Sequence, residues 1–315
     1  MAKINTVLGA IDSKDMGFTL SHEHMISAFT GIYKDFPSLL GSGDLMDRVV
    51  ADLKQAKDGG VNTIVDATTP DLGRDIEFIA EASKRSGVNI IVTSGWWLEI
   101  PGFLRSVSSD QLADQFVREI EDGISGTKIK AGVLKSASDM NGVKPEEEVI
   151  LRAVARAHKR TGVPIMLHSY PAGQVGRQQI NILKQEGVDL HRVKIDHSND
   201  TADVEYLSWL CDQGCFLGLD RYPGRGVTTL GRTKTMKALI DAGYADKLCP
   251  SHDRLALRVE GLNDPVTPEL RAKYNPYGFL FVKKVVFDQL REMGVGESVI
   301  DNLCVKGPRH FFEAR

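Results

Sequence analysis

Short apolar runs alternate with amphipathic segments along most of the chain. Segments with helical periodicity separate these runs, and several end in Gly just before the next run, as helices commonly do. The eight runs that predict strands span residues 18–24, 61–68, 89–97, 129–137, 163–170, 192–199, 215–222 and 247–253. Eight strand–helix units in 315 residues predict an α/β protein with the (β/α)8 TIM-barrel fold.

An open, doubly wound parallel sheet is the alternative, but no G-x-G-x-x-G motif follows the first predicted strand. No low-complexity stretch divides the chain, so we expect one domain over residues 1–315. The stretch from about 254 to 276 is predicted to be a long loop after the last strand. Residues from Val282 onward are predicted to form closing helices.

The composition narrows the choice of partners. Hydrophobic residues make up 42%, and 39 Lys and Arg against 42 Asp and Glu give a net charge of −3, which gives no reason to expect a nucleic acid or an anionic membrane. No apolar run approaches the roughly 20 residues of a membrane span, and the start has no signal-peptide core. The cysteines are well separated, which is typical of reduced thiols: Cys211, Cys215, Cys249 and Cys304. We expect a cytoplasmic protein.

The stretch "FTLSHEH" places two imidazoles on one side of the first predicted strand. Residues i and i+2 of a strand project to the same face, so His22 and His24 point one way and Glu23 points the other. The pair alone is compatible with half of a metal site or with two polar residues at a strand end.

Other side chains able to bind metal also lie at the ends of predicted strands. They stand at or near the ends of five predicted strands: His22, His24, Lys135, His168, His197 and Asp253. Functional residues of such barrels gather at the C-terminal ends of the strands, so we expect these six to converge. By alternation, Val133 shares a face with Lys135, and Val193 and Ile195 share one with His197.

The remaining histidines are interpreted as ordinary polar residues: His158, His191, His252 and His310. Crowded imidazoles repel one another when protonated, and a divalent cation removes that cost because it binds neutral imidazole and carboxylate. The six side chains therefore suggest a metal centre at the mouth of the barrel.

Lys135 allows two interpretations. A buried ammonium beside metal ions is unfavourable, so Lys135 either pairs with a carboxylate such as Asp253 or Asp66, or reacts with carbon dioxide. The resulting carbamate is an anionic ligand that can bridge two metal ions. Spacing alone leaves both open.

Eight motifs along nearly the whole chain resemble the phosphotriesterase family of the amidohydrolase superfamily, including its phosphotriesterase-like lactonases. The motifs are "SHEH", "GVNTIVDAT", "KAGVLK", "GVPIMLH", "HSNDT", "GLDRY", "SHD" and "VKGPRHFF". The resemblance implies a more buried metal ion on His22, His24 and Asp253. It also implies a more exposed ion on His168 and His197, with N6-carboxylated Lys135 and a hydroxide bridging the two ions.

The resemblance also implies a mechanism. Two divalent ions roughly 3.5–4 Å apart, with Zn expected and Co, Mn or Fe compatible, activate water for attack on a carbonyl or phosphoryl group. Asp253 would then take up the released proton, and Asp200 matches an acidic relay position. Asp200 fits equally well as the N-cap of the following helix, alone or with Thr201.

The expected substrate-binding residues are Trp97, Arg221 and Arg254. Arg221 in "GLDRY" resembles the lactonase pattern, whereas Trp97 stands where lactonases usually have Tyr and phosphotriesterases have Trp. Arg254 begins the charged stretch after Asp253. The principal hypothesis is a hydrolase of small lactones or related esters, with promiscuous cleavage of organophosphate triesters.

Two alternatives remain: a phosphotriesterase or carboxylesterase proper, which Trp97 favours, and a barrel that binds a metal or small molecule without turnover. Lys135 disfavours a mononuclear deaminase. A homodimer is expected by resemblance, and apolar residues in "FTGIYKDFPSLL" could contribute to its interface, although core packing or a pocket wall explains them equally well.

Overall fold

A parallel sheet forms the centre of the computed structural model, which describes residues 2–224, 226–259 and 268–313. Its strands are β3 (Thr19–Ser27), β4 (Thr63–Asp66), β5 (Asn89–Gly95), β6 (Val133–Ala137), β7 (Ile165–His168), β8 (Val193–Ile195), β9 (Phe216–Leu219), β10 (Leu248–Pro250) and β11 (Leu255–Arg258). The order is β10-β9-β8-β7-β6-β5-β4-β3-β11, with parallel pairing between neighbours. Each of the eight predicted strands contains or overlaps one of these strands.

The last strand comes in two parts, and these close the barrel. β10 pairs with β9, whereas β11 pairs with β3 in a register that places Leu255 opposite His24. One short chain segment therefore joins both edges of the sheet, and the predicted (β/α)8 barrel is confirmed. The long loop predicted from 254 to 276 is wrong in two places, since it contains β11 and helix α9 (Pro268–Tyr274). The open edge of β3 supplies the hydrogen bonds that make residues 255–258 a strand. Residues 260–267 of that loop lie outside the described part.

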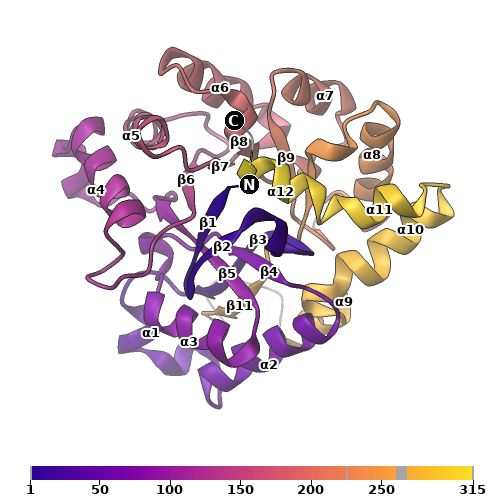
Figure 1. Ribbon diagram of the computed structural model, residues 1–315, viewed down its shortest axis with the longest axis horizontal. Coiled ribbons are helices and arrows are strands. Elements are labelled where there is room, and N and C mark those ends of the chain that lie inside the picture. The colour runs from indigo at the N-terminus through magenta and orange to yellow at the C-terminus, as the bar shows by residue number, and fades with distance from the viewer. Residues whose placement is uncertain (1, 225, 260–267, 314–315) are drawn as a thin grey trace.

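Helices surround the strands as a ring (Figure 1). They are α2 (Leu45–Asp58), α3 (Ile76–Ser86), α4 (Ser109–Glu121), α5 (Pro145–Thr161), α6 (Gly176–Gln185), α7 (Val204–Asp212) and α8 (Thr229–Asp241). The predicted closing helices are present as α10 (Phe287–Glu292), α11 (Glu297–Leu303) and α12 (Lys306–Glu313). Within the described ranges, none of these helices combines the length and apolar character needed to cross a membrane.

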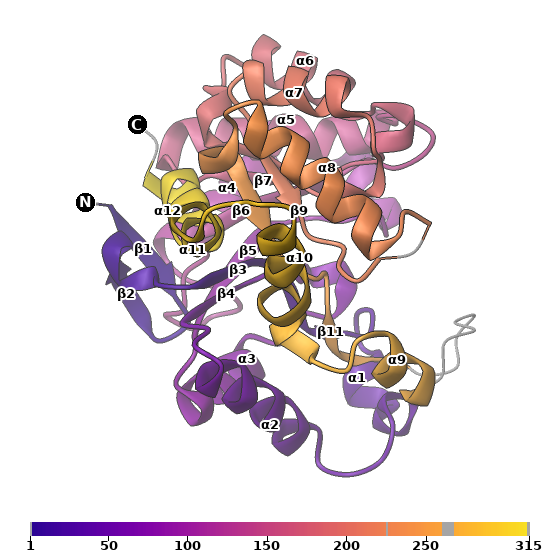
Figure 2. The same cartoon turned by 90° about the vertical axis from the view of Figure 1, so that its right-hand side faces the viewer.

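The two ends of the barrel are covered differently. A hairpin of β1 (Lys3–Thr6) and β2 (Gly9–Asp12) lies with α12 at one end, and α1 (Ile32–Asp35) and α9 lie at the other (Figure 2). At the first end, Ile4, Phe311 and Phe312 pack against residues from inside the barrel such as Met166. This end is therefore a closed apolar floor, which leaves the opposite end for chemistry.

One strand departs from the predicted alternation. Lys194 and Asp196 point into the barrel, where Lys194 Nζ reaches the carbonyl of Ser21 on β3 at 3.3 Å. Val193 and Ile195, which were predicted to share the face of His197, instead belong to the large cluster that includes the surrounding helices. The prediction failed because the backbone at His197 is left-handed, with φ of 62°, and this reverses the direction of its side chain.

Candidate metal centre

The six predicted metal-binding side chains meet at the mouth of the barrel. His24 Nε2 lies 3.2 Å from Asp253 Oδ1, and His22 Nε2 lies 3.5 Å from the same oxygen. One ligand atom from each of these three residues lies within 4.8 Å of the others, which is close enough to hold one metal ion. This cluster thus combines two imidazoles from β3 with the carboxylate of Asp253, which follows β10.

His168 and His197 form the other side of the mouth. Their nitrogens Nδ1 and Nε2, respectively, are 2.7 Å apart, and their rings meet edge to face with centroids 4.4 Å apart. The ring of His22 lies 5.0 Å from that of His197, so the two groups of imidazoles are neighbours.

Lys135 lies between the two groups. Its side chain is buried, and Nζ is 3.1 Å from His22 Nε2. Burial lowers the pKa of this amine. The carboxylate Asp66, one of its predicted partners, instead accepts hydrogen bonds from the backbone amides of Met25 and Thr68. Within the described residues no ion pair joins Lys135 to Asp66 or Asp253, so the predicted pairing with either carboxylate is not observed.

Three of the four imidazoles have an oxygen close to Nδ1, the ring nitrogen that faces away from the proposed ion. His24 Nδ1 lies 2.8 Å from the hydroxyl of Thr68, and His197 Nδ1 lies 2.9 Å from Asp220 Oδ1. Another oxygen of Asp220 lies 3.1 Å from His22 Nδ1. Metal-binding histidines are commonly oriented in this way, with one nitrogen held and the other directed at the ion. The donor set therefore fits a pair of divalent metal ions.

Sequence reasoning missed Asp220 and Asp196. Asp220 precedes Arg221 and follows the inward-facing Phe216 and Gly218 by alternation, which was a usable signal. Asp196 precedes His197 directly, and it was hidden by the assumption that His197 itself continued the inward face of its strand. Asp196 Oδ2 lies 3.1 Å from His22 Nδ1.

The imidazoles differ in their proton affinity. Burial lowers the pKa of His24, and it lowers the pKa of His168 and His197 to well below the usual range. Burial and Lys135 also act against protonation of His22, but nearby carboxylates, Asp196 first, raise its pKa overall. Most of the ligands are therefore neutral and ready to donate an electron pair to a cation.

Asp253 has a left-handed backbone, with φ of 52°, and its segment is fastened to Glu23. Glu23 points away from the neighbouring histidines, as predicted, and Oε1 accepts from the hydroxyl of Ser251 at 2.7 Å. The same oxygen lies 2.7 Å from His252 Nδ1, and His252 Nε2 accepts from the amide of Val282 at 3.1 Å. His252 is thus a structural residue that helps to hold Asp253 in an unusual conformation.

Asp200 forms ion pairs with two arginines, and one of them lies between Asp200 and Asp253. Arg221 Nη1 donates to Asp200 Oδ2 at 2.6 Å, while its Nε donates to Asp253 Oδ2 at 3.2 Å. Arg232 Nη2 lies 2.7 Å from the other oxygen of Asp200. Because a guanidinium does not release its proton in proteins, this arrangement favours a role for Asp200 in holding Arg221 over proton relay.

The predicted N-cap at Asp200 is wrong. The cap of α7 is Asp203, whose side chain accepts from the amide of Tyr206. Thr201 instead accepts from the amide of Asp203. Asp200 is drawn away from the helix by its arginine partners, which only the folded chain brings near.

Of the other two predicted substrate contacts, Trp97 lies at the barrel mouth and Arg254 does not. Trp97 Nε1 donates to His168 Nδ1 at 3.4 Å, so Trp97 borders the cluster. Arg254 does not join it, because its guanidinium binds Asp52 of α2 and lies 5.1 Å from the ring centre of Phe279. The interpretation of Arg254 as a substrate contact is therefore not supported by its position.

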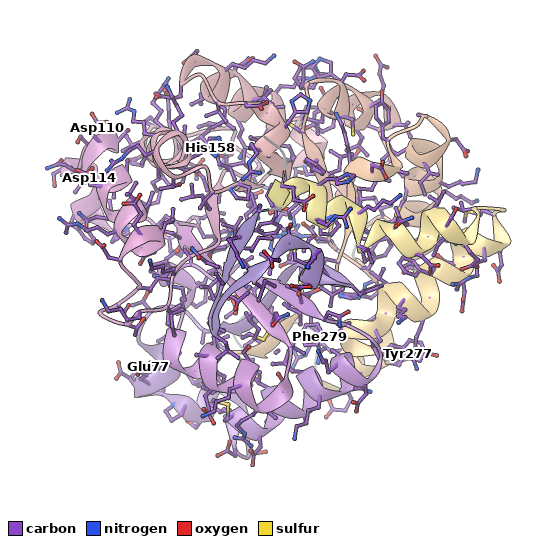
Figure 3. The ribbon with its side chains drawn as sticks, viewed as in Figure 1. Glu77, Asp110, Asp114, His158, Tyr277 and Phe279 are labelled. Carbon is purple, nitrogen blue, oxygen red and sulfur yellow. The ribbon has the colours of Figure 1, made fainter. Side chains whose placement is uncertain are left out.

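Two of the histidines that were interpreted as ordinary polar residues have local partners. His158 is buried on α5, outside the strands, and its Nδ1 lies 2.8 Å from the carbonyl of Val163 (Figure 3). His191 Nδ1 lies 3.0 Å from Asp189. These contacts satisfy the imidazoles without any ligand.

Comparisons with known proteins extend over nearly the whole chain. A model of the phosphotriesterase family matches residues 2–312. An aryldialkylphosphatase of Saccharolobus solfataricus is 36% identical over 96% of this chain and 97% of its own length. A phosphotriesterase homology protein of Mycobacterium tuberculosis is 36% identical over 99% of this chain and 98% of its own length. An N-acetyltaurine hydrolase of Mus musculus is 24% identical over 98% of this chain and 97% of its own length.

Proposed function

The chain belongs to the phosphotriesterase family, and from this premise we propose that it hydrolyses lactones or related esters, with organophosphate triester cleavage as a secondary activity. The family consists of hydrolases that depend on a binuclear metal centre, and the His and Asp clusters at the barrel mouth fit that requirement. The observation that carries the proposal is the convergence of six side chains from the ends of five strands.

The proposed ligands divide into two groups. His22, His24 and Asp253 would hold one ion and His168 and His197 the other, with a carbamate formed on Lys135 shared between them. The unprotonated amine of Lys135, which its lowered pKa favours, would attack carbon dioxide, forming a C–N bond and releasing a proton to solvent. When bound, the pair of ions, which we expect to be zinc, supplies an activated water and polarises the substrate carbonyl or phosphoryl oxygen.

The chain's own residues would complete the reaction. Asp253 would accept the proton of the attacking water, because Oδ1 faces His22 and His24. Arg221 would orient Asp253 through its 3.2 Å hydrogen bond to Oδ2. Trp97 would form an apolar wall beside His168 and exclude water from that part of the pocket.

Other substrate classes and a non-catalytic role are the alternatives to this proposal. A phosphotriesterase or carboxylesterase proper is favoured by Trp97, and an amide substrate is suggested by the name of the mouse relative. A barrel that binds metal without turnover is the third alternative, and the six polar groups gathered at one mouth argue against it because burying them is costly for packing alone.

A substrate panel tests the proposal. Protein reconstituted with Zn²⁺ and bicarbonate is assayed with a pH indicator on γ- and δ-lactones, acyl homoserine lactones, aryl esters, paraoxon-like triesters and N-acyl amides. We expect about two ions per chain and the highest kcat/KM on a lactone. A triester, aryl ester or amide that exceeds every lactone would replace the proposed substrate class, and no metal-dependent turnover would favour the non-catalytic barrel.

We also propose one domain over residues 1–315 and a homodimer. Phe29, Phe36 and Leu39 are 42%, 55% and 39% exposed, respectively, so these members of the predicted interface segment are not core residues. Leu40 in the same segment is fully buried. Sedimentation velocity of the wild type would check the oligomeric state.

A further inference from the structure

The interior of the barrel contains a charged pair that the proposed chemistry does not use. Lys194 on β8 and Asp196 just after it have fully buried side chains, and Lys194 Nζ forms an ion pair with Asp196 Oδ1. Other strands place apolar residues such as Val133 and Met166 inside the barrel. Burying an ion pair costs desolvation that the mutual attraction often does not recover. The pair therefore requires an explanation beyond packing.

Asp196 contacts His22 on the side of the ring opposite to the proposed metal ion. Its Oδ2 lies 3.1 Å from His22 Nδ1, and Asp220 Oδ2 lies 3.1 Å from the same nitrogen. Neither contact is well aligned as a hydrogen bond, and none of the three atoms has another hydrogen-bond partner in the described part of the chain. Both carboxylates therefore face the same nitrogen of His22.

Gly218 on β9 makes this close approach of carboxylates possible. A Cβ atom at this position would lie 2.5 Å from Asp196 Oδ1 and 2.5 Å from Asp220 Oδ2. Any other residue would displace one or both carboxylates, so the absence of a side chain is a requirement of the arrangement.

Lys194 balances the negative charge of the two carboxylates. Burial alone would raise the pKa of Asp196, but Lys194 and then His22 bring it below its ordinary value. Burial opposes the charge of Lys194 in the same way, and Asp196 and Asp220 nevertheless raise its pKa. The contact between Lys194 Nζ and Asp196 Oδ1 thus brings opposite charges together inside the barrel.

We propose that Asp196, balanced by Lys194, is a positioning residue for the metal centre: with Asp220 it keeps the proton of His22 on Nδ1. The Nε2 atom of His22 then keeps its electron pair for a divalent cation. This inference rests on the proposed metal-dependent function. It gives Asp196 a role in orienting His22, whereas the neighbouring His197 would bind a metal ion itself.

The test measures zinc affinity rather than turnover. Metal-free protein is titrated with Zn²⁺ and bicarbonate against a chromogenic chelator, and the melting temperature is recorded with and without Zn²⁺. We expect Asp196→Asn to weaken zinc binding about 10- to 100-fold. The difference in Tm between the zinc-loaded and zinc-free forms should shrink, because stabilisation by a ligand grows with its affinity.

A double variant separates positioning from packing. Asp196→Asn alone leaves Lys194 buried without its anion, so the fold is destabilised as well. Lys194→Met combined with Asp196→Asn removes both charges, and the Tm of the zinc-free form should return toward the wild-type value. Zinc affinity should stay low. A double variant that binds zinc as tightly as the wild type would overturn the inference.

Glu119→Gln is the matched control outside the barrel. Glu119 accepts hydrogen bonds from the buried guanidinium of Arg74 at 2.5 and 3.0 Å, so the control also deprives a buried cation of its carboxylate. Its Tm should fall while zinc affinity stays unchanged. An equal loss of zinc affinity in the control and in Asp196→Asn would also overturn the inference.

Zinc binding by the wild type distinguishes a failure of the proposed function from a failure of the role of Asp196 alone. A wild-type protein that binds no zinc would contradict the proposed function, and the inference with it. A wild type that binds zinc, together with an Asp196→Asn variant of equal affinity, would contradict only the role of Asp196.

Discussion

The two sides of the barrel mouth both carry imidazoles, but nearby charges act on these imidazoles differently. On one side, carboxylates raise the pKa of His22 although burial and Lys135 oppose it. On the other side, burial lowers the pKa of His168 and His197, and the positive charge of Arg221 lowers both further. Among the four imidazoles, only His22 has a raised pKa, and its neighbouring carboxylates cause the rise.

A cation should respond to this difference. Coulomb attraction in a partly buried site is several times stronger than in water, so excess negative charge near His22 favours a divalent ion there. The positive charge of Arg221, whose guanidinium binds Asp253 Oδ2, acts on His168 and His197. We therefore expect the two ions to differ in affinity, with the tighter one beside His22.

Lys135→Ala removes the group that lies between the two sides. We expect metal-dependent hydrolysis to fall on the order of 10³-fold, the size of effect seen when a group that stabilises the transition state is lost. Short carboxylic acids should restore part of the activity by replacing the carbamate, as kcat/KM measurements would show. Lys128→Ala, an exposed lysine on the preceding segment, is the control and should behave as wild type. Full activity of Lys135→Ala would exclude a bridging role.

The unequal affinity of the two sides is tested by removing one ligand from each. His168→Asn should retain about one ion per chain under a limiting chelator, because the tighter of the two ions in such a centre is left intact. His24→Asn should weaken the tighter ion instead. Metal analysis after dialysis measures both. If His168→Asn lost both ions, or His24→Asn kept the tight one, the two sides would not differ as described.

Arg221 binds Asp253 and lowers the pKa of His168 and His197, and Asp200 binds its guanidinium. Arg221→Met should lower kcat/KM about 10-fold, the value of one hydrogen bond to a charged group. Asp200→Asn should have a smaller effect, since Arg221 would still reach Asp253. An effect of Asp200→Asn that exceeds that of Arg221→Met would instead support proton relay through Asp200.

Charges outside the barrel should affect stability only. Hydrogen bonds from Arg156 and Arg152 hold the pKa of Glu186 below its ordinary value. This ion cluster stabilises the fold at neutral pH, and its contribution is lost as the pH falls from the unfolded-state pKa through the lower folded-state pKa. Glu186→Gln should cost less than about 1 kcal/mol and flatten the dependence of Tm on acidic pH. A loss of zinc affinity in this variant would contradict the separation of the two regions.

The sequence by itself determined where most of the chemistry stands. Strict alternation on β3 placed His22 and His24 on one face and Glu23 on the other, and strand ends identified Lys135 and His168. These predictions succeeded because alternation and strand termination are local properties that a few neighbouring residues specify.

Only the tertiary structure decided the rest. His197 and Asp253 reach the mouth through left-handed backbone conformations, which contacts with Asp220 and Glu23 hold in place. The buried charge of Lys194 was also missed, although its partner Asp196 stands two residues away, because the expected inward direction of His197 turned both side chains to the other face. The backbone strain at His197 and Asp253 depends on partners distant in sequence, and a one-dimensional pattern carries no record of them.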